Sequence, residues 1–294
     1  MPRNPLHYLQ FLLHGSRDAK HPPRKKNQAK ERRTRRRKIE KPKQTQNHAP
    51  KSKSKKDIAP PKQPQQQQTP KPNWPPLRPL IPSSDLTLDP LLPDQIYLIP
   101  NFFTANLCKT YVSFLSSLPL TTTPGKPKKG DAVRVNDRFQ IQDERFAESL
   151  WSGTALKDLV MNGNGEGERS MKEIWGGEPL GLNANIRIYR YSKGQFFAQH
   201  YDDSNTLTFS SPSHPSQPAR TTWTLLIYLT TCSGGETIFY PESTRGNRNP
   251  EPVSVAPVTG MALLHRHGDR CLLHEGSEVS DGEKWVLRSD LVVR

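Results

Sequence analysis

The chain has 294 residues, of which 43 are Lys or Arg and 28 are Asp or Glu, and its formal net charge is +15 at pH 7. Residues 1–80 hold 22 of the basic residues and only 4 of the acidic ones, so the remainder has a net charge of −3. The excess of positive charge therefore belongs to residues 1–80 and gives no indication of what the remaining residues bind. The three cysteines lie far apart without a paired spacing, which excludes a disulfide-rich framework and favours a reducing compartment.

Residues 1–80 form the first predicted region, a disordered arm rich in basic residues, proline and glutamine. The arm holds 14 of the 29 prolines and a glutamine run at 65–68. Such a composition buries too little apolar surface to offset the entropy lost on ordering. The basic clusters at 24–26 and 32–38 have three interpretations: a nuclear import signal for an importin, non-specific contact with nucleic acid, or a solvated tail without a partner.

The start of the chain contains a short apolar stretch at 9–13, which is interrupted by Gln10 and followed by basic residues. It lacks the length of a membrane span and the small-residue cleavage site of a secretory signal. We therefore expect no membrane contact and a location in the nucleus, the cytoplasm or both. A mitochondrial presequence is an alternative, because Arg3 and Arg17 precede the first acidic residue.

Residues 81–182 are predicted to form a helical support for the domain that follows. A short strand is expected at 96–99. Thr104 then offers a side-chain oxygen as the N-cap of a helix, whose apolar residues recur at helical spacing until Pro119 ends it. A second amphipathic helix is expected at 146–159, either continuous or divided at Gly153.

A compact charged run, RVNDR at 134–138, lies between the two expected helices. It has two interpretations. The run lines the entrance for a substrate, or it forms a salt-bridged surface loop.

The last predicted region, residues 183–294, has a pattern of short strands separated by glycine-containing turns. Strands are expected at 186–189, 223–229, 237–240, 261–264, 271–274 and 285–293. Short strands after helices predict an α+β, mainly β fold, a double-stranded β-helix (jelly roll) braced by N-terminal helices. Two inserts rich in Pro, Ser or Asn, at 204–219 and 242–257, are expected at the surface.

His200 and Asp202 are the first candidate site residues. Side chains two positions apart in an extended segment point to the same side, so these two converge while Tyr201 points away. Two imidazoles and one carboxylate on one face are the ligands of a non-haem Fe(II) oxygenase centre. Such a centre leaves three positions of octahedral iron open, two for a chelating keto acid and one for dioxygen.

The third ligand has to come from a distant strand, and the candidates are His265, His267 and His274. His265 and His267 fall in the polar sequence HRHGDR, which we expect to be a turn with solvent-exposed imidazoles. His274 ends an apolar strand, where packing can fix its orientation. We therefore predict that His274 is the third metal ligand.

Lys284 and Arg288 share one face of the last expected strand. A cationic side chain there could bind the far carboxylate of an acidic co-substrate. We predict that Lys284 has this role, with Arg288 as the alternative. Without the upstream histidines, such a lysine is typical of a solubilising strand residue.

The segments YSKGQFFAQHYDD, TLLIYLT, SGGETIFYP and LLHEG, followed by KWVLRSD, resemble the catalytic core of the prolyl 4-hydroxylase branch of the Fe(II)/2-oxoglutarate dioxygenases. The resemblance extends over about residues 94–294 and is best over 183–290. It implies that residues 183–294 are the dioxygenase core. The residue roles that it implies are His200, Asp202 and His274 as iron ligands, Lys284 as the site for the C5 carboxylate of 2-oxoglutarate, and Tyr191 and Tyr228 as residues that line or hydrogen-bond this co-substrate.

The resemblance also implies a reaction. Fe(II), 2-oxoglutarate and dioxygen would hydroxylate a protein side chain, such as that of a prolyl residue, and release succinate and CO2, with ascorbate as the reductant. The basic arm raises an alternative, a nuclear enzyme that demethylates nucleic acid oxidatively. The demethylases of that kind carry two arginines after the last histidine, where this chain has Lys284. Two further alternatives are a non-catalytic binding protein that retains the barrel and a zinc hydrolase. For Tyr191 and Tyr228 the alternative is a core aromatic with a satisfied hydroxyl.

Overall fold

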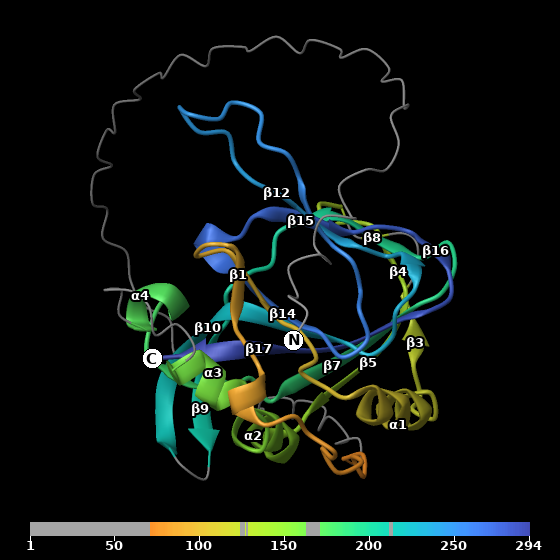
Figure 1. Cartoon of the computed structure of the whole chain (residues 1–294), viewed down its shortest axis with the longest axis vertical. Helices are drawn as coiled ribbons and strands as arrows, with labels where there is room; N and C mark the ends of the chain where they lie inside the picture. The colour runs from red at the N-terminus through yellow and green to blue at the C-terminus, as the bar shows by residue number, and fades with distance from the viewer. Residues whose placement is uncertain (1–70, 124–126, 128, 163–170, 212–213) are drawn as a thin grey trace, which may run out of the picture. The chain divides into compact units, whose positions relative to one another are not determined.

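Antiparallel strands in two facing sheets form the centre of the fold in this computed structural model (Figure 1). The structure describes residues 71–123, 127, 129–162, 171–211 and 214–294, all of which fall within one unit, residues 65–294. The predicted arm up to residue 70 lies outside the described residues.

The larger sheet contains the last strand of the chain at its centre. From edge to edge its order is β1 (Asp89–Leu92), β2 (Ile96–Ile99), β14 (Ala262–Arg266), β10 (His214–Tyr228), β17 (Lys284–Val293), β7 (Asn185–Tyr191), β5 (Asp137–Gln142) and β3 (Thr121–Thr122). In addition, β6 (Pro179–Leu182) pairs with β17, and β9 (Thr206–Ser211) pairs with β10. Every one of these pairings is antiparallel.

The smaller sheet faces the inner side of the larger one. Its order is β13 (Val253–Val255), β12 (Thr237–Tyr240), β15 (Leu273–Gly276), β8 (Phe196–His200) and β4 (Arg134–Val135). A separate ribbon joins β11 (Ser233–Gly234) to β16 (Val279–Asp281), and short 3-10 turns η2 (Ser83–Asp85) and η3 (Gly268–Arg270) complete the described elements. Two antiparallel sheets packed face to face confirm the predicted jelly roll.

The alternation of side chains along β17 separates two environments. Trp285 and Leu287 belong to the hydrophobic core under the helices, on the outer face of the larger sheet. Lys284, Val286 and Arg288 point to the other face, where they line a cavity between the two sheets. Because successive strand residues point to opposite faces, one strand supplies both the core and the site.

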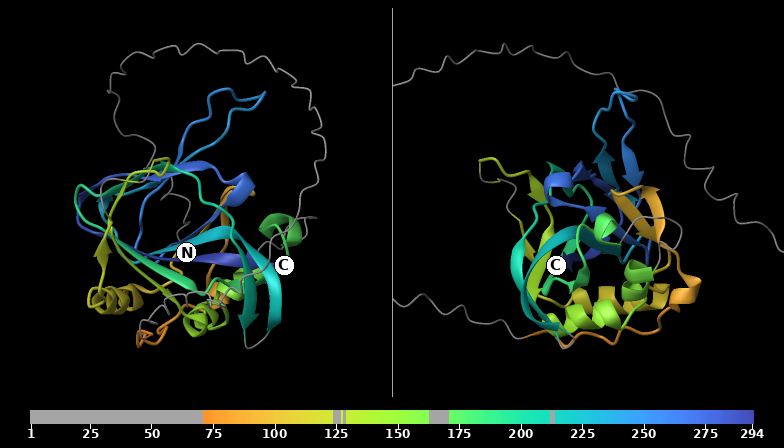
Figure 2. Two further views of the ribbon diagram at one scale, coloured as in Figure 1. Left: turned by 180° about the vertical axis from the view of Figure 1, so that it is seen from behind. Right: turned by 90° about the vertical axis from the view of Figure 1, so that its left-hand side faces the viewer.

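The helices lie together against the outer face of the larger sheet, on the side away from the protruding loop between β12 and β13 (Figure 2). They are α1 (Ala105–Leu115), α2 (Glu144–Ser152) and α3 (Leu156–Asn162), with the short α4 (Met171–Trp175) nearer the C-terminus. Thr104 is the N-cap of α1, as predicted, and accepts a hydrogen bond from the Leu107 amide at 3.2 Å. Gly153 ends α2, so the second predicted helix is two helices. No helix of the described residues is long and apolar enough to cross a membrane.

The segment 81–182 is more than a helical support. Its strand β2 pairs with β14, β5 pairs with β7, and β4 pairs with β8 of the smaller sheet. The predicted strand at 96–99 is confirmed as β2. The segment thus supplies strands to both sheets, which its helical sequence pattern did not indicate.

Residues 71–80, which the sequence pattern assigns to the arm, pack against the helices. Trp74 stacks on Phe146 with ring centroids 4.0 Å apart, and its indole N–H donates to Asp143 at 2.9 Å. Asp143 is also the N-cap of α2. The Tyr111 hydroxyl donates to the carbonyl of Pro75 at 2.8 Å. The packed part of the chain therefore begins ahead of the predicted boundary at residue 80.

Removing residues 1–80 is expected to lower the free energy of unfolding by about 2–4 kcal/mol relative to removing residues 1–70. The difference arises because a half-buried tryptophan and its stacking partner lose their contacts. Urea denaturation of the two truncated proteins measures it. The shorter deletion is the matched control, since it removes no contact described above, and equal midpoints for both proteins would contradict the assignment of this segment to the folded unit.

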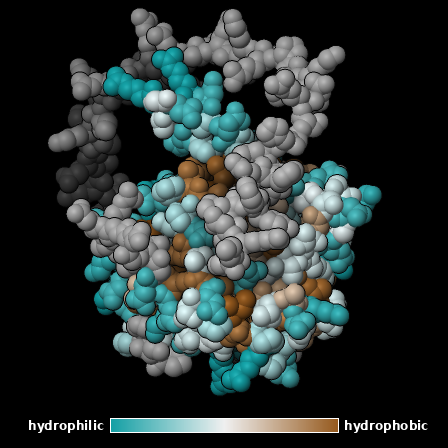
Figure 3. All heavy atoms as spheres, in the orientation of Figure 1, coloured by the Kyte–Doolittle hydropathy of each residue, from teal (hydrophilic) through white to brown (hydrophobic). Residues whose placement is uncertain are grey.

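The two inserts behave differently. Residues 242–249 of the second insert are all exposed, and this hydrophilic loop protrudes from the molecule in Figure 3, as predicted. The rest of this insert differs from the expectation, because residues 253–255 form β13 and Val255 is buried. The insert at 204–219 is not a plain surface loop, because β9 and the start of β10 pair as a hairpin. Phe209 and Ala219 of this hairpin are buried with Leu180 and Val292, so the insert contributes a small core of its own.

The three cysteines, Cys108, Cys232 and Cys271, are all within the described residues and are free. Cys108 and Cys271 are buried, and Cys232 is half-buried.

Candidate metal and co-substrate site

Two paired strands of the smaller sheet bring the predicted ligands together. His200 of β8 lies directly opposite His274 of β15, with ring centroids 4.2 Å apart. Asp202 follows β8, and its carboxylate forms a group with both imidazoles in which all ligand atoms lie within 4.8 Å of one another. Tyr201 points away and is 59% exposed. The structure thus unites His200, Asp202 and His274 as the sequence predicts.

The distances within this group suit a metal ion. Nε2 of His200 lies 3.8 Å from Oδ1 of Asp202, and Nε2 of His274 lies 3.8 Å from Oδ2. Both distances are too long for hydrogen bonds. Two ligand atoms that each lie about 2.1 Å from one ion can be at most about 4.2 Å apart. The gaps are therefore of the size that a shared ion would bridge.

The backbone holds the other nitrogen of each ring. Nδ1 of His200 donates to the Ala198 carbonyl at 2.8 Å, and Nδ1 of His274 donates to the Leu272 carbonyl at 2.9 Å. Because a carbonyl only accepts, the proton sits on Nδ1 and Nε2 keeps its lone pair. Metal-binding imidazoles are oriented in this way by hydrogen bonds at the far nitrogen.

Both imidazoles are uncharged at neutral pH. Burial, and after it the repulsion between the two rings when both are protonated, lowers the pKa of His200 to about 4. Burial also lowers the pKa of His274 from its usual value. Neutral imidazoles are the form that binds a metal, so the donor set of His200, Asp202 and His274 fits Fe(II) in both chemistry and spacing.

Asp202 is held as a carboxylate by an arginine and a threonine. Arg288 Nη2 lies 2.9 Å from Oδ2, Arg288 Nη1 donates to Oδ1 at 3.3 Å, and the Thr224 hydroxyl donates to Oδ2 at 3.0 Å. Burial alone would raise the pKa of Asp202, but the positive charge of Arg288 and the adjacent histidines lower it well below its usual value. Asp202 therefore stays ionised, as a metal ligand must.

Arg288 is already engaged by two carboxylates. Besides Asp202, its Nε lies 3.4 Å from Oδ1 of Asp290. Burial disfavours its charge, yet these two carboxylates raise the pKa of Arg288 above its usual value. This pairing favours a role for Arg288 in positioning Asp202 over the alternative role in binding the co-substrate.

Lys284 lies in the same cavity, and its ammonium has no carboxylate partner among the described residues. The cavity has a volume of about 50 Å³ and is lined by His200, Asp202 and Lys284 among others. Lys284 Nζ donates to the Gly235 carbonyl at 2.7 Å and to the Thr237 hydroxyl at 3.4 Å. Burial lowers the pKa of Lys284 to about 8. A buried ammonium of this kind fits an anionic ligand that would stabilise its charge.

Tyr191 and Tyr228 both lie beside the ammonium of Lys284. Its Nζ is 5.6 Å from the ring centroid of Tyr191 and 5.4 Å from that of Tyr228. Tyr191 lines the cavity, whereas the Tyr228 hydroxyl is hydrogen-bonded to Thr237 at 2.7 Å. Tyr191 can therefore contact a bound co-substrate. Tyr228 instead packs beside the Lys284 ammonium and positions Thr237 through its hydroxyl. Thr237 could not be identified from the sequence, because a lone threonine in a strand carries no functional signal.

The expectation that His265 and His267 are exposed is wrong. Their side chains are 2% and 4% exposed. Strand β14 continues to Arg266, since the Arg266 guanidinium is buried over the Trp223 ring and donates to backbone carbonyls, including that of Asp94 at 3.0 Å. The alternation of Leu263 and His265 along β14 is the signal that could have placed His265 on the inner face.

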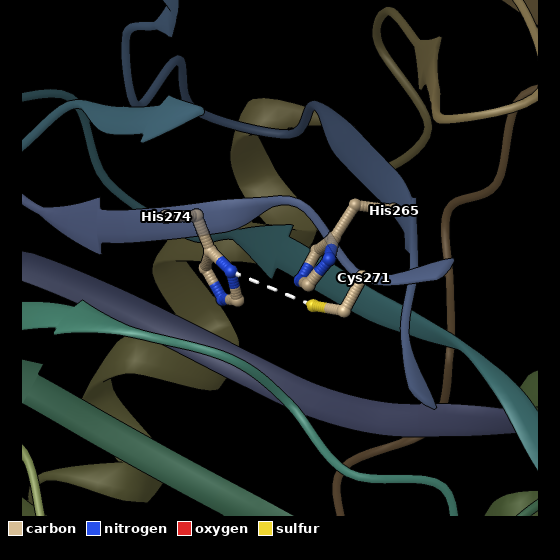
Figure 4. Close-up of side chains that lie close together, drawn as sticks. All are labelled: His265, Cys271 and His274. Carbon is tan, nitrogen blue, oxygen red and sulfur yellow. Dashed lines mark hydrogen bonds between the residues drawn. The ribbon is translucent and has the colours of Figure 1, made fainter. Parts of the chain in front are cut away.

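The two histidines have different surroundings. Both ring nitrogens of His267 are used, by the Thr224 hydroxyl at 3.0 Å and the Thr221 hydroxyl at 2.9 Å. His265 lines the cavity, and its Nε2 lies 3.6 Å from Oδ2 of Asp202. Figure 4 shows its ring beside that of His274, with Cys271 next to both.

A wide cleft of about 1140 Å³ opens beside the ligands. Its walls include Arg134 and Arg138 of the charged run, together with Arg187 and the exposed Tyr201. Asp137 of the same run instead forms a salt bridge with Arg190 at 2.7 Å. Arg134 and Arg138 thus line the cleft, while the expectation of a surface loop is wrong, because the run belongs to β4 and β5 and its Asn136 and Asp137 are buried.

Comparison with known proteins finds one family model that matches part of the chain. Residues 186–289, which include all four of the predicted ligand and co-substrate residues, match the family model described as the 2OG-Fe(II) oxygenase superfamily. A search of curated proteins found no match to the chain.

Several solved structures resemble this one. A collagen prolyl hydroxylase of Paramecium Bursaria Chlorella virus-1, in complex with 2OG, is 16% identical with a TM-score of 0.42 and covers 68% of this chain and 97% of its own. A Pseudomonas putida prolyl-4-hydroxylase is 14% identical with a TM-score of 0.43 and covers 68% and 93%. A Trichoplax adhaerens prolyl hydroxylase, in complex with a hypoxia inducible factor peptide fragment, is 17% identical with a TM-score of 0.46 and covers 67% and 83%.

Proposed function

We propose that this chain, whose residues 186–289 match the 2OG-Fe(II) oxygenase superfamily, is a dioxygenase that hydroxylates a protein side chain at the cavity around Asp202. The match of these residues to the superfamily supports a dioxygenase that uses Fe(II), 2-oxoglutarate and dioxygen. The nature of the substrate, with a prolyl residue as the first candidate, and the release of succinate and CO2 are our proposal.

One observation carries the assignment of the residues. A single cavity presents a metal-type donor set at one end and an ammonium without a carboxylate partner among the described residues at the other. His200, Asp202 and His274 would hold the iron, and Lys284 would bind the far carboxylate of 2-oxoglutarate. A charge-assisted hydrogen bond of this kind is stronger than one between neutral groups, which suits a dicarboxylic ligand.

When bound, the iron supplies the redox chemistry that couples the decarboxylation of 2-oxoglutarate to hydroxylation of the substrate. The chain positions the reacting groups. Arg288 and Thr224 fix the orientation of the Asp202 carboxylate, while Phe197 stacks on the His200 ring with centroids 3.5 Å apart. These contacts keep the donor atoms in place.

The cleft beside the ligands supports a polymeric substrate. Its volume of about 1140 Å³ exceeds the roughly 300–1,000 Å³ that is typical of small-molecule pockets. Arg134, one of its basic residues, lies over the rings of Tyr189 and Phe197, with its guanidinium carbon 4.7 Å from the Phe197 centroid. A planar cation beside aromatic rings at the cavity entrance can hold an extended peptide over the site.

The proposal is tested with purified protein, Fe(II) and 2-oxoglutarate. Slow release of succinate is expected without any substrate. A cell extract is then incubated with active protein or with an inactive variant, and peptides that gain one oxygen atom are sought by mass spectrometry. The proposed substrate class is contradicted if formaldehyde is released from methylated nucleic acid while no peptide gains oxygen.

Binding of 2-oxoglutarate is expected to weaken as the pH rises through the pKa of Lys284, which is about 8 in the empty cavity. Below that pH the Lys284 ammonium is charged, so its protonation adds no pH dependence to the affinity for 2-oxoglutarate. Above it, each further pH unit lowers the apparent affinity by about tenfold, because the ligand has to recruit the protonated form. Calorimetric titrations between about pH 7 and about pH 9 measure this, and a flat profile would mean that Lys284 is not the anchor.

Two further roles are proposed from the sequence. Ascorbate would serve as the reductant, and the basic arm would direct the chain to the nucleus through an importin. Deletion of residues 1–70 should leave succinate release unchanged and shift a fluorescently tagged protein into the cytoplasm. Retention in the nucleus after this deletion would refute the import signal.

A further inference from the structure

Two arginine side chains meet at Tyr189, where the cavity opens into the wide cleft. Arg138 of β5 lies directly opposite Tyr189 of β7, and side chains at such paired positions are neighbours on one face of the sheet. The guanidinium carbon of Arg134, on β4 of the smaller sheet, lies 5.4 Å from the centroid of the Tyr189 ring. Tyr189 lines both the cavity around Asp202 and the cleft. The two positive charges therefore lie next to the route that a substrate has to take.

Both arginines are available to a ligand. Phe139 belongs to the core under the helices, so its neighbour Arg138 points to the opposite face of β5 and into the cleft. Neither Arg134 nor Arg138 has a carboxylate partner among the residues that the structure describes, whereas Arg187 in the same cleft is bound by Asp290 at 2.8 Å. The cleft thus presents two guanidinium groups whose charge no neighbouring acid neutralises.

The cleft also carries negative charges, but at other places. Asp131 and Asp203 line it from loops, outside the strands that hold the arginines, and both are exposed. A continuous run of phosphates would meet these carboxylates as well as the arginines, and like charges at an interface disfavour such a partner. A peptide with a single acidic side chain avoids this repulsion. The charge pattern therefore favours an acidic peptide over nucleic acid.

The strand register limits how far the acidic side chain is from the reacting residue. Arg288, which holds Asp202, lies opposite Arg187, and Arg187 lies opposite Gln140. Arg138 precedes Gln140 by two residues on the same strand. Two strand spacings and a two-residue step separate the backbone positions of Arg138 and Arg288 by about 12 Å. Because an extended peptide advances about 3.3 Å per residue, this span corresponds to about four residues.

We propose that Arg134 and Arg138 select a peptide that carries an Asp or Glu within about four residues of the hydroxylated residue. This inference rests on the proposed function and names the substrate class of the same site. A guanidinium donates charge-assisted hydrogen bonds to a carboxylate, often two at once. A lysine at the same place in the peptide is repelled by both arginines. The arginines do not reach the reacting atoms, so they act on the binding of the peptide and not on the chemical step.

Twelve-residue peptides with one central proline test this selection. Glu, Gln or Lys is placed in turn at each of the four positions on either side of the proline, and all other positions are Ala or Ser. The full chain is supplied with Fe(II) and 2-oxoglutarate, and the gain of one oxygen atom is followed by mass spectrometry. At the preferred position we expect a KM about 10-fold lower for the Glu peptide than for the Gln peptide, with equal kcat. Fluorescence anisotropy of the labelled peptides measures binding without turnover.

Three variants assign the preference to the arginines. Arg134→Gln and Arg138→Gln should each reduce the preference for Glu over Gln by about 3-fold, which is typical of a partly exposed ion pair. Arg138→Glu should reverse it, so that the Lys peptide binds more tightly than the Glu peptide. A merely structural residue would weaken all peptides alike. Arg145→Gln is the matched control, because Arg145 is exposed on α2 and does not line the cleft, and it should keep the full preference.

The outcomes separate this inference from the proposed function. If Glu and Gln peptides gain oxygen with equal KM, or if no peptide binds, the inference is overturned, and in the first case the proposed function stands. If no peptide gains oxygen but the Glu peptide still binds in a manner that depends on Arg138, the anion site stands and the proposed hydroxylation fails. If a methylated single-stranded oligonucleotide displaces the Glu peptide and Arg138→Glu abolishes its binding, the cleft selects nucleic acid and the inference is overturned.

Discussion

Replacing Asp202 by alanine is expected to abolish metal binding and 2-oxoglutarate-dependent succinate release. The carboxylate is the one group that faces all three cavity imidazoles, His200, His265 and His274. Turnover should fall by more than about 100-fold, which is the largest loss expected when a residue that only positions a metal ligand is removed. Metal analysis after dialysis and a succinate assay measure both effects.

The variant also leaves the buried Arg288 with a single carboxylate partner, Asp290. Uncompensated buried charge costs about 3–5 kcal/mol, so a folding defect has to be separated from loss of the ligand. Asp202→Asn keeps the shape and a hydrogen-bond acceptor for Arg288 but loses the ligand charge. Asp89→Ala, at an exposed position of β1, is the control and should bind metal and turn over normally. Metal binding by a folded Asp202→Ala protein at the level of the control would contradict the site.

Replacing Lys284 by methionine is expected to raise the dissociation constant of 2-oxoglutarate by about 10- to 150-fold, since a hydrogen bond to a charged group contributes about 1.5–3 kcal/mol. Methionine keeps the length and apolar contacts of the lysine stem beside Tyr191 and Tyr228. Metal affinity should not change, because Lys284 is no ligand. Calorimetry with the Co(II)-loaded protein measures the two constants separately.

Lys193→Met is the matched control, because Lys193 is exposed at a turn. An unchanged affinity for 2-oxoglutarate in Lys284→Met, or an equal loss in the control, would show that the co-substrate is anchored elsewhere. Arg288 would then be the next candidate. A gain in affinity would mean that the buried ammonium opposes rather than assists binding.

The strands of the core could be predicted because their patterns are local. Residues 223–229 are mostly apolar and residues 285–293 are apolar at both ends, and the two segments fall in the strands β10 and β17 of the larger sheet. The N-cap at Thr104 is equally local. The pairing of Trp74 with Phe146 could not be predicted, since a tryptophan within a proline-rich segment gives no indication of a partner 72 positions away.

The same distinction applies to the site. The spacing of His200 and Asp202 predicts their convergence, because it follows from the geometry of one extended segment. His265 was misplaced because a polar sequence was interpreted as a turn, whereas the buried Arg266, which donates to the Asp94 carbonyl, extends β14 by two residues beyond its predicted end. The salt bridge between Arg288 and Asp202 forms because the two sheets face each other, and no local sequence pattern encodes this arrangement.

The most direct measurement is the fate of dioxygen. Purified protein with Fe(II) and 2-oxoglutarate is supplied with isotopically heavy dioxygen, and the succinate formed is analysed by mass spectrometry. A dioxygenase of this kind places one heavy oxygen atom in each succinate, and Asp202→Ala should form none. Succinate that forms without heavy oxygen, or that forms equally in Asp202→Ala, would contradict oxygen chemistry at this site.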